Sequence, residues 1–404
     1  MSELLAVLVA LALAFVFKEF VRAFGVPRVV GEISAGIVLG LMIMGGVFFS
    51  QATLGFFSLL ANIGAIMLFF FVGLEINLRQ AKKNLRQALS VSVISTFLSL
   101  FLGIYVSTTF FGLDIVAATI VGIALAVSAV ALSMDFLEEL GLLKTHVANI
   151  IVTAGAVDDV IEFFLIALIL AVLNTAIGQS NLLFFVLQVL FFAIIVVVFK
   201  LFIVSGALRF FAREHSEASV FGGGIMLTLF MAVIAEVSGL GSFLGALIAG
   251  VVVAESLKEK AVGKARIWEA HTLIRSIHAI GFGFLVPVFF VWVGLNLNIL
   301  ALLASIPFML ALLFMAFFGM VAGASVAVLL NKGTLKEGIL VGLGIAPKGD
   351  VELAIATLAL SQGVIQQSVF APIVGMAILT TIIAPITFKW LLKKWGHELG
   401  PSRT

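Results

Sequence analysis

The chain has 404 residues, of which 63% are hydrophobic and only 11% are charged, and its formal net charge at pH 7 is +2. Because soluble domains carry about 25% charged residues, this composition excludes a soluble protein and indicates an all-α polytopic membrane protein. The chain has no cysteine, which excludes disulfides and thiolate metal sites. The small net charge comes from basic loop residues and gives no sign of a nucleic-acid partner.

Thirteen apolar segments follow one another along the chain, separated by short loops. The first has no basic residues before it and no small-residue cleavage site, so we interpret it as a membrane helix and not as a signal peptide. We predict a single membrane domain with 13 transmembrane helices, at about residues 3–17, 27–46, 55–75, 87–110, 114–134, 147–172, 181–208, 219–237, 240–256, 273–295, 300–330, 335–361 and 367–392.

The positions of lysine and arginine support this count. Those between the predicted helices all fall on one side of the membrane, after helices with odd numbers. Because basic loops face the cytoplasm, we predict an external N-terminus, a cytoplasmic C-terminus and a location in the cell (inner or plasma) membrane. Two lysines lie inside apolar segments instead: Lys200 can reach the cytoplasmic end of its helix, whereas Lys348 cannot easily do so.

Two short patterns recur in the two halves of the chain. Residues 31–39 are similar to 245–253, and residues 72–77 are similar to 293–298, at offsets of 214 and 221 residues. The matches relate predicted helix two to nine and three to ten, so the two copies would have opposite orientations in the membrane. Inverted repeats are typical of secondary transporters, and chance similarity between apolar helices is the alternative.

Two predicted helices contain sequences that do not favour a continuous helix. The segment 114–134 reads Ala-Val-Ser-Ala-Val-Ala at 126–131, and the segment 335–361 carries Gly344, Pro347 and Gly349 close together. Proline and glycine interrupt helices, and irregular backbone in a membrane is tolerated where it is buried or lines a cavity. We predict that both helices are broken and that the breaks present helix ends and free carbonyls to an ion.

Three charged residues, Lys348, Asp350 and Glu352, coincide with the second break. A proline kink between two ordinary half-helices is the alternative to a break, but a kink does not explain charges at the same place. Charged side chains at membrane depth are costly and commonly functional. We therefore predict supporting roles for all three at an ion-binding site.

The most informative pattern is the pair Asp158-Asp159 in an otherwise apolar segment, with Glu162 about one turn later. A carboxylate in the hydrocarbon region of a membrane usually binds a cation or a proton. The same carboxyl group can exchange a bound cation for a proton. Because the three carboxyl groups interact, their protonation is a property of the whole cluster and cannot be assigned to one residue. We predict cation and proton binding at Asp158 and Asp159, supported by Glu162. The alternative is a structural pair neutralised by Lys348 or Lys200.

Together these patterns resemble the cation:proton antiporter family. The resemblance rests on residues 27–36 (Pro-Arg-Val-Val-Gly-Glu-Ile-Ser-Ala-Gly), 70–75 (Phe-Phe-Val-Gly-Leu-Glu), the aspartate pair at 158–159, and 346–350 (Ala-Pro-Lys-Gly-Asp). It is closest to the NapA type of sodium/proton antiporters, and the membrane domains of KefB and KefC are more distant. It implies an NhaA/NapA-like antiporter fold with two inverted-topology repeats, crossed broken helices and a homodimer.

The resemblance also implies a division of this single transport domain. A panel or dimer part would comprise residues 1–86 and 219–299, and a moving core transport part would comprise 87–172 and 300–394. The helix 181–210 would link them. Exchange in the family proceeds by an elevator-like movement of the core.

Roles for individual residues follow from the same resemblance. In the family the second aspartate of the pair is the main cation and proton carboxylate, which corresponds here to Asp159. The first aspartate, Asp158, assists, and a hydroxyl residue on the broken helix, here Ser128, is a cation ligand.

The sequence departs from the family pattern in three places. The predicted helix 300–330 lacks the basic residue found in paired-aspartate members, and Met320 takes its place. Glu162 is an additional acid, and the second break reads Lys-Gly-Asp-Val-Glu at 348–352, where Arg-Gly-Glu is common. The missing basic residue leaves the stoichiometry open, and Glu162 and Lys348 are the candidates to compensate.

We predict a secondary active antiporter, not an enzyme, that exchanges Na⁺, or else Li⁺ or K⁺, for H⁺ without a cofactor. Its partners would be these ions, membrane lipid and a second copy of the chain. A Kef-like potassium efflux system is one alternative, although such systems usually carry a Gln-Asp pair and a long nucleotide-binding tail. The remote alternative is an intramembrane aspartyl protease using Asp159 and Asp350, which the preceding Pro-Lys-Gly disfavours.

Overall fold

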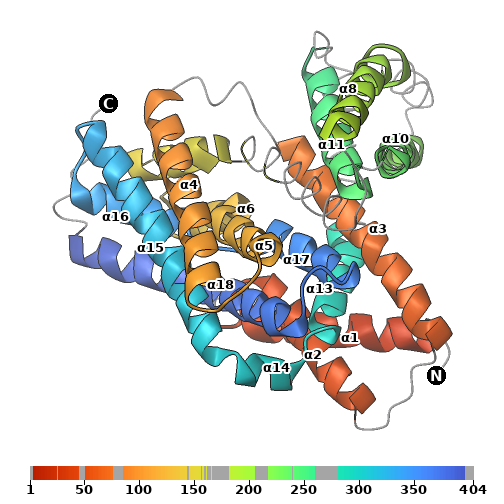
Figure 1. Cartoon of the computed structure of the whole chain (residues 1–404), viewed down its shortest axis with the longest axis horizontal. Helices are drawn as coiled ribbons and strands as arrows, with labels where there is room; N and C mark the ends of the chain where they lie inside the picture. The colour runs from red at the N-terminus through yellow and green to blue at the C-terminus, as the bar shows by residue number, and fades with distance from the viewer. Residues whose placement is uncertain are drawn as a thin grey trace. The chain divides into compact units, whose positions relative to one another are not determined.

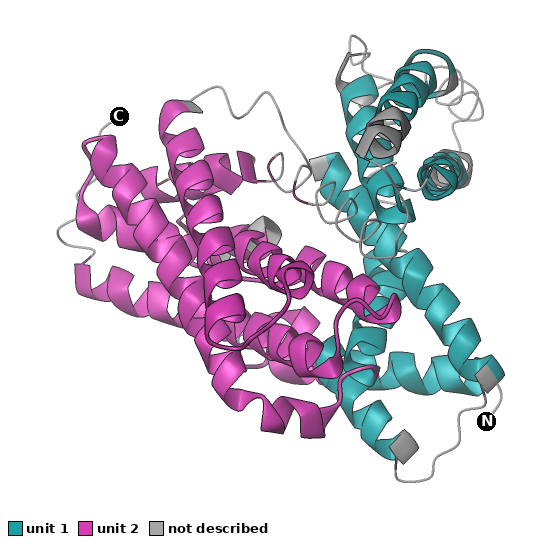
Figure 2. Ribbon diagram, in the orientation of Figure 1, with its two compact units in different colours: residues 1–16, 32–76, 166–295 teal, residues 17–31, 77–165, 296–404 magenta. Residues whose placement is uncertain are grey.

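The computed structural model describes residues 3–24, 26–44, 51–75, 85–142, 145–155, 157–158, 161, 165, 182–204, 217–238, 240–259 and 281–395. All regular elements in these residues are α- or π-helices (Figure 1). The chain divides into two compact units, each assembled from separate stretches of sequence (Figure 2). Unit 1 comprises residues 1–16, 32–76 and 166–295, and unit 2 comprises 17–31, 77–165 and 296–404.

Unit 1 holds the middle of the chain and most of its N-terminal region. α1 (Glu3–Arg22) and α2 (Arg28–Met44) each contribute residues to both units. The described helices that lie wholly in unit 1 are α3 (Gln51–Glu75), α8 (Leu182–Val198), η2 (Phe199–Val204), α10 (Glu217–Val237), α11 (Ser242–Glu259), η4 (Gly281–Leu285) and α13 (Val286–Leu295).

Two pairs of glycines bring the helix backbones of unit 1 into direct contact. Gly36 of α2 lies against Gly294 of α13, and Gly73 of α3 lies against Gly250 of α11. A Cβ atom at any of the four would overlap a backbone carbonyl oxygen of the facing helix. Small residues allow helices in a membrane to approach this closely, so these positions determine how α2, α3, α11 and α13 pack.

Unit 2 contains the elements on which most of the predicted site residues lie. Its described helices are α4 (Leu85–Thr109), α5 (Ile115–Ala126), α6 (Val130–Glu139), the helix His146–Gly155, α14 (Ile299–Ala304), α15 (Ile306–Leu330), α16 (Leu335–Gly344), α17 (Val351–Ser361) and α18 (Gln367–Trp395).

Local sequence explains where several of these helices begin. Asp114 precedes α5, and its carboxylate accepts hydrogen bonds from the backbone N–H groups of Val116 and Ala117 at 2.9 and 3.0 Å. Thr334 and Glu337 form a capping box at the start of α16. Such caps satisfy N–H groups that have no partner within the helix, and each contributes about 1 kcal/mol.

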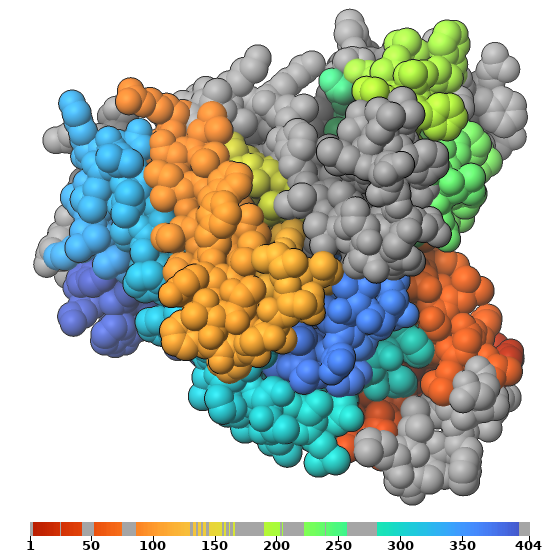
Figure 3. All heavy atoms as spheres, viewed as in Figure 1, coloured from red at the N-terminus to blue at the C-terminus, as the bar shows by residue number. Residues whose placement is uncertain are grey.

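α4 has two different faces. One forms part of the surface of unit 2 (orange in Figure 3) and exposes Phe97, Phe101 and Tyr105. The other packs against α15, where Gly319 and Gly323 face Ser99 and Ser95. Because the small residues lie on the inner face and the aromatic residues on the outer, the orientation of α4 is fixed by its sequence.

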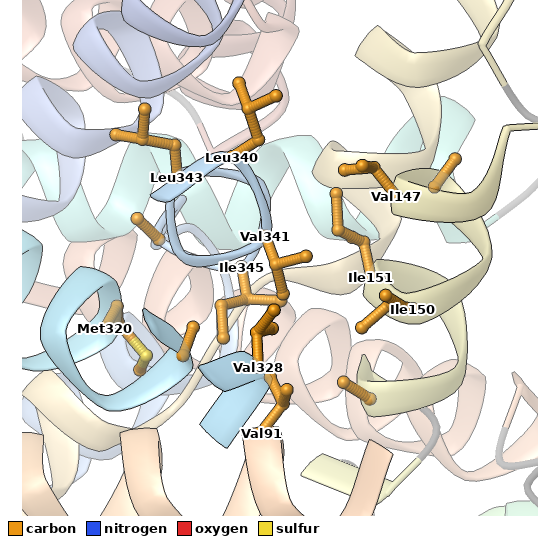
Figure 4. Packing of buried hydrophobic residues seen from close by; sticks show 14 of the residues in the cluster. Val91, Val147, Ile150, Ile151, Met320, Val328, Leu340, Val341, Leu343 and Ile345 are labelled. Atoms are coloured by element: carbon orange, nitrogen blue, oxygen red, sulfur yellow. The ribbon is translucent and has the colours of Figure 1, made fainter. Parts of the chain in front are cut away.

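A cluster of buried apolar side chains fills the interior of unit 2 (Figure 4). Val341 and Ile345 of the α16 region belong to this cluster, together with Ile151 of the helix His146–Gly155 and Val91 of α4. The cluster therefore packs against α16 up to its C-terminal end at Gly344. Met320 of α15 belongs to the same cluster and is fully buried.

Five described helices are long and apolar enough to cross a membrane: Glu3–Arg22, Ala52–Leu74, Arg86–Thr109, Ile306–Leu330 and Gln367–Trp395. Shorter apolar helices lie in other predicted segments, among them Gly222–Val237 and Ser242–Ser256. The expectation of an all-helical, multi-pass membrane protein agrees with these elements, while the count of 13 spans stays a prediction.

The glycine contacts in unit 1 predict a stability difference. Gly250→Ala would press a methyl group onto the carbonyl oxygen of Phe70, and overpacking of this kind costs about 1–3 kcal/mol. We expect a lower midpoint of thermal unfolding in detergent. Gly55→Ala on α3 is the matched control, because a Cβ at Gly55 would meet nothing within 4 Å. Equal stability of the two variants would contradict the packing described above.

Candidate functional site

Two helices of unit 2 are interrupted at the places that the sequence predicts. α5 ends at Ala126 and α6 begins at Val130, with Val127 in an extended conformation between them. α16 ends at Gly344 and α17 begins at Val351. Each break leaves the carbonyl groups of one helix end and the N–H groups of the next helix start without their usual partners.

The two breaks contact each other directly. The backbone N–H of Ala129 in the first break donates to the carbonyl of Pro347 in the second at 2.9 Å. The Lys348 ammonium donates to the carbonyl of Val127. The Thr381 hydroxyl on α18 donates to the Lys348 carbonyl. Side-chain and backbone bonds together therefore join the breaks, which we call the crossing (residues 127–129 and 345–350).

Lys348 lies inside the protein with 0% of its surface exposed. A cation is stabilised at the carbonyl end of a helix, where the partial negative charge of the helix dipole is concentrated, and Lys348 occupies this position at α5. Its charge also acts on the carboxyl groups of Asp158 and Glu352.

Asp158 lies next to the first break and is buried. Its Oδ2 atom accepts a hydrogen bond from the Ser128 hydroxyl at 3.1 Å. Its Oδ1 atom accepts from the hydroxyls of Ser92 and, at 2.9 Å, Thr96. The structure thus brings two predicted residues, Asp158 and Ser128, together and adds two hydroxyl residues of α4 that the sequence analysis did not single out.

The acids at the start of α17 have different environments. Asp350 caps the helix, and its carboxylate accepts from the backbone N–H of Val351 at 3.1 Å. Glu352 is the second residue of the helix and has 0% of its surface exposed. Two other predicted residues, Asp159 and Glu162, lie outside the described residues.

Two further sequence expectations concern basic residues. Lys200, in η2 of unit 1, forms an ion pair with Glu255 at 2.9 Å. α15 contains no lysine or arginine, and Met320 lies in the apolar cluster of Figure 4. The position at which the family resemblance predicts a basic residue therefore holds a fully buried apolar side chain.

Oxygen atoms make up this site: the two carboxylate oxygens of Asp158 and one oxygen from each of the three hydroxyls that donate to them. Hard cations such as Na⁺ are bound by oxygen ligands, and a carboxylate can alternatively be neutralised by a proton. Among the described residues, no three His, Cys, Asp or Glu side chains form a group that could hold a metal ion. These oxygen atoms are chemically suited to bind either a hard cation or a proton.

The sequence matches the model of one protein family, the transmembrane sodium/hydrogen exchangers, over residues 7–394. It is 28% identical to the Na⁺/H⁺-K⁺ antiporter GerN of Bacillus cereus over 368 residues, which are 91% of this chain and 90% of that protein. It is 26% identical to a Na⁺/H⁺ antiporter of Enterococcus hirae over 375 residues, 92% of this chain and 94% of that protein.

The fold is similar to that of the sodium proton antiporter MjNhaP1 from Methanocaldococcus jannaschii. The TM-score is 0.66 with 17% sequence identity, and the alignment covers 98% of each chain. At this identity the likeness concerns the fold.

The role of Lys348 at the crossing can be tested by its removal. Lys348→Met would leave the carbonyl end of α5 and the nearby carboxyl groups without their cation. Loss of one partner from a buried charge interaction costs about 3–5 kcal/mol, so we expect a large fall in the midpoint of thermal unfolding. Lys389→Met, at an exposed position on α18, is the control and should unfold like the wild-type protein. A wild-type midpoint for Lys348→Met would refute this role.

Proposed function

The chain belongs to the sodium/hydrogen exchanger family, and on this premise we propose that it is a secondary antiporter exchanging a monovalent cation for H⁺. The observation that carries the proposal is the buried Asp158 carboxylate, which three hydroxyls surround beside two broken helices. Na⁺ is the expected substrate. Li⁺ and K⁺ use the same ligand types, and the relative from Bacillus cereus has both Na⁺ and K⁺ in its name.

Competition for the same carboxyl groups couples the two fluxes. A proton on the carboxyl group removes the charge that attracts the cation, and a bound cation repels the proton. Asp159 is the proposed principal carboxylate, with Asp158, Ser128 and carbonyl groups of the first break completing the shell. The site carries either ion but not both at once, so a gradient of one drives transport of the other.

Alternating access requires one part of the protein to move relative to another. We assign the moving part to the core at 87–172 and 300–394 and the panel or dimer part to 1–86 and 219–299, with 181–210 as the linker. The location of Asp158, Ser128 and Lys348 together in unit 2 supports this assignment. A homodimer in the cell membrane, with the N-terminus outside and the C-terminus in the cytoplasm, completes the proposal.

The glycine pairs support the inverted repeat. The offsets of 214 and 221 residues relate Gly36 to Gly250 and Gly73 to Gly294. The second offset also relates Phe70 to Val291. The contact of Gly36 with the Val291 carbonyl therefore corresponds to the contact of Gly250 with the Phe70 carbonyl. Each copy therefore uses equivalent residues against the other, as two copies related by a twofold axis would. Thirteen spans, with helix 181–210 between the copies, fit this symmetry.

The two alternatives find less support. A Kef-like efflux system is not favoured, since the similar proteins reported above are Na⁺/H⁺ antiporters by name. For an intramembrane aspartyl protease, two aspartates would have to share a water molecule. Asp350 instead uses its carboxylate to cap α17.

Asp159→Asn tests the principal carboxylate. An amide cannot take up a proton or supply the negative charge that a cation needs, so we expect complete loss of cation-dependent ΔpH dissipation in vesicles. Glu138→Gln is the control, since Glu138 is an exposed carboxyl on α6 of unit 2. Transport by Asp159→Asn with Na⁺, Li⁺ or K⁺ would refute the assignment.

The two α4 hydroxyls that donate to Asp158 can be tested by removing each in turn. Ser92→Ala and Thr96→Val each remove a hydrogen bond to the Asp158 carboxylate. Such bonds to charged groups contribute about 1.5–3 kcal/mol, so we expect the apparent KM for Na⁺ to rise roughly tenfold. Ser90→Ala is the matched control, because the Ser90 hydroxyl donates to a backbone carbonyl of its own helix at an exposed position. An unchanged KM in both test variants would contradict a role in cation binding.

A further inference from the structure

One buried acid beside the crossing, in α17, has no function in the exchange described so far. Glu352 has 0% of its surface exposed, and neither carboxyl oxygen makes a hydrogen bond to any described residue. The backbone N–H groups of Gly349 and of Glu352 itself act on this carboxyl group, but neither forms a hydrogen bond of normal geometry with it. Asp158, by contrast, accepts bonds from three hydroxyls.

This difference determines which form of Glu352 the structure can hold. An ionised carboxylate removed from water and left without hydrogen bonds is far more costly than a neutral carboxylic acid. Among the described residues Glu352 has no such bond, so they accommodate its side chain as the neutral acid. Its anion would need a partner that the described residues do not supply in this arrangement.

The charged groups that act on Glu352 come from its own stretch of chain. Lys348 attracts a negative charge there and Asp350 repels it. The described helices packed against α17 are α5, which has no ionisable side chain, and α18, whose lysines lie in its last two turns. Lys348 is thus the one described cation that could stabilise the Glu352 anion.

Lys348 also connects Glu352 with the cation site. In the structure its ammonium donates to the Val127 carbonyl, and its charge acts on both Asp158 and Glu352. A cation bound at Asp158 would repel the ammonium group from that side of the crossing. The ammonium would then be closer to Glu352 and would stabilise its anion.

Resting on the proposed function, we propose that Glu352 is a second proton-exchanging residue, which releases its proton when the site at Asp158 binds a cation. The step is a simple ionisation in which the carboxylic acid becomes a carboxylate and a proton passes to water, with no electron transferred. Glu352 takes a proton and not Na⁺, because the helix N–H groups and Lys348 around it are positive and repel a cation.

Proton release on cation binding tests the proposal without transport. Binding of Na⁺ to the full-length protein in detergent is measured by titration calorimetry in buffers with different heats of ionisation, which gives the protons released per Na⁺ bound. We expect Glu352→Gln to release about one proton fewer than the wild-type protein, because an amide has no proton to give. Glu138→Gln should match the wild-type protein. Equal release from Glu352→Gln and wild-type protein would overturn the proposal.

The remaining outcomes are also decisive. If Glu352→Gln binds no cation, the infrared carbonyl band of protonated carboxyl groups is followed against pH. A band that disappears as the pH rises in the wild-type protein, and is absent from Glu352→Gln, supports the proposal. A band that is unchanged by the substitution overturns it. If the wild-type protein binds none of Na⁺, Li⁺ and K⁺, the proposed function fails first and this inference with it.

Discussion

The site depends on one interaction, the hydrogen bond from the Lys348 ammonium to the carbonyl of Val127. A broken helix inside a membrane leaves carbonyl groups without donors, and a lysine inside a membrane lacks water. Each of these defects is costly alone, and each is compensated by the other. The break can therefore persist in the buried interior of unit 2, where it presents the Ser128 hydroxyl to Asp158.

Much of this arrangement could be predicted from the sequence because it depends on unusual residues. Proline and glycine in the segment 335–361 predict a break, and charges next to them predict a site. Asp158 and Ser128 were both expected at that site, and they are joined by a hydrogen bond. The break and the contact between Asp158 and Ser128 could be foreseen because a buried charge and a proline each have few structural explanations, while the ion-binding role of these residues stays a prediction.

Other parts of the site carry no such signal. Ser92 and Thr96 bind Asp158, but Ser95 and Thr108 on the same helix bond to carbonyls of their own backbone. All four are hydroxyl residues in one apolar helix, and only the packing of α4 in unit 2 distinguishes them. In the same way, Asp350 and Glu352 are alike in sequence, yet one caps a helix and the other has no described hydrogen-bond partner.

The glycine pairs of unit 1 have a mechanical consequence. Most helix interfaces can slide by small amounts because side chains change rotamer, but Gly36, Gly73, Gly250 and Gly294 place backbone directly on backbone. Without side chains between them, these helices cannot shear past one another gradually. We therefore expect α2, α3, α11 and α13 to move together as one block, with the change of conformation taken up by the segments that enter and leave this block.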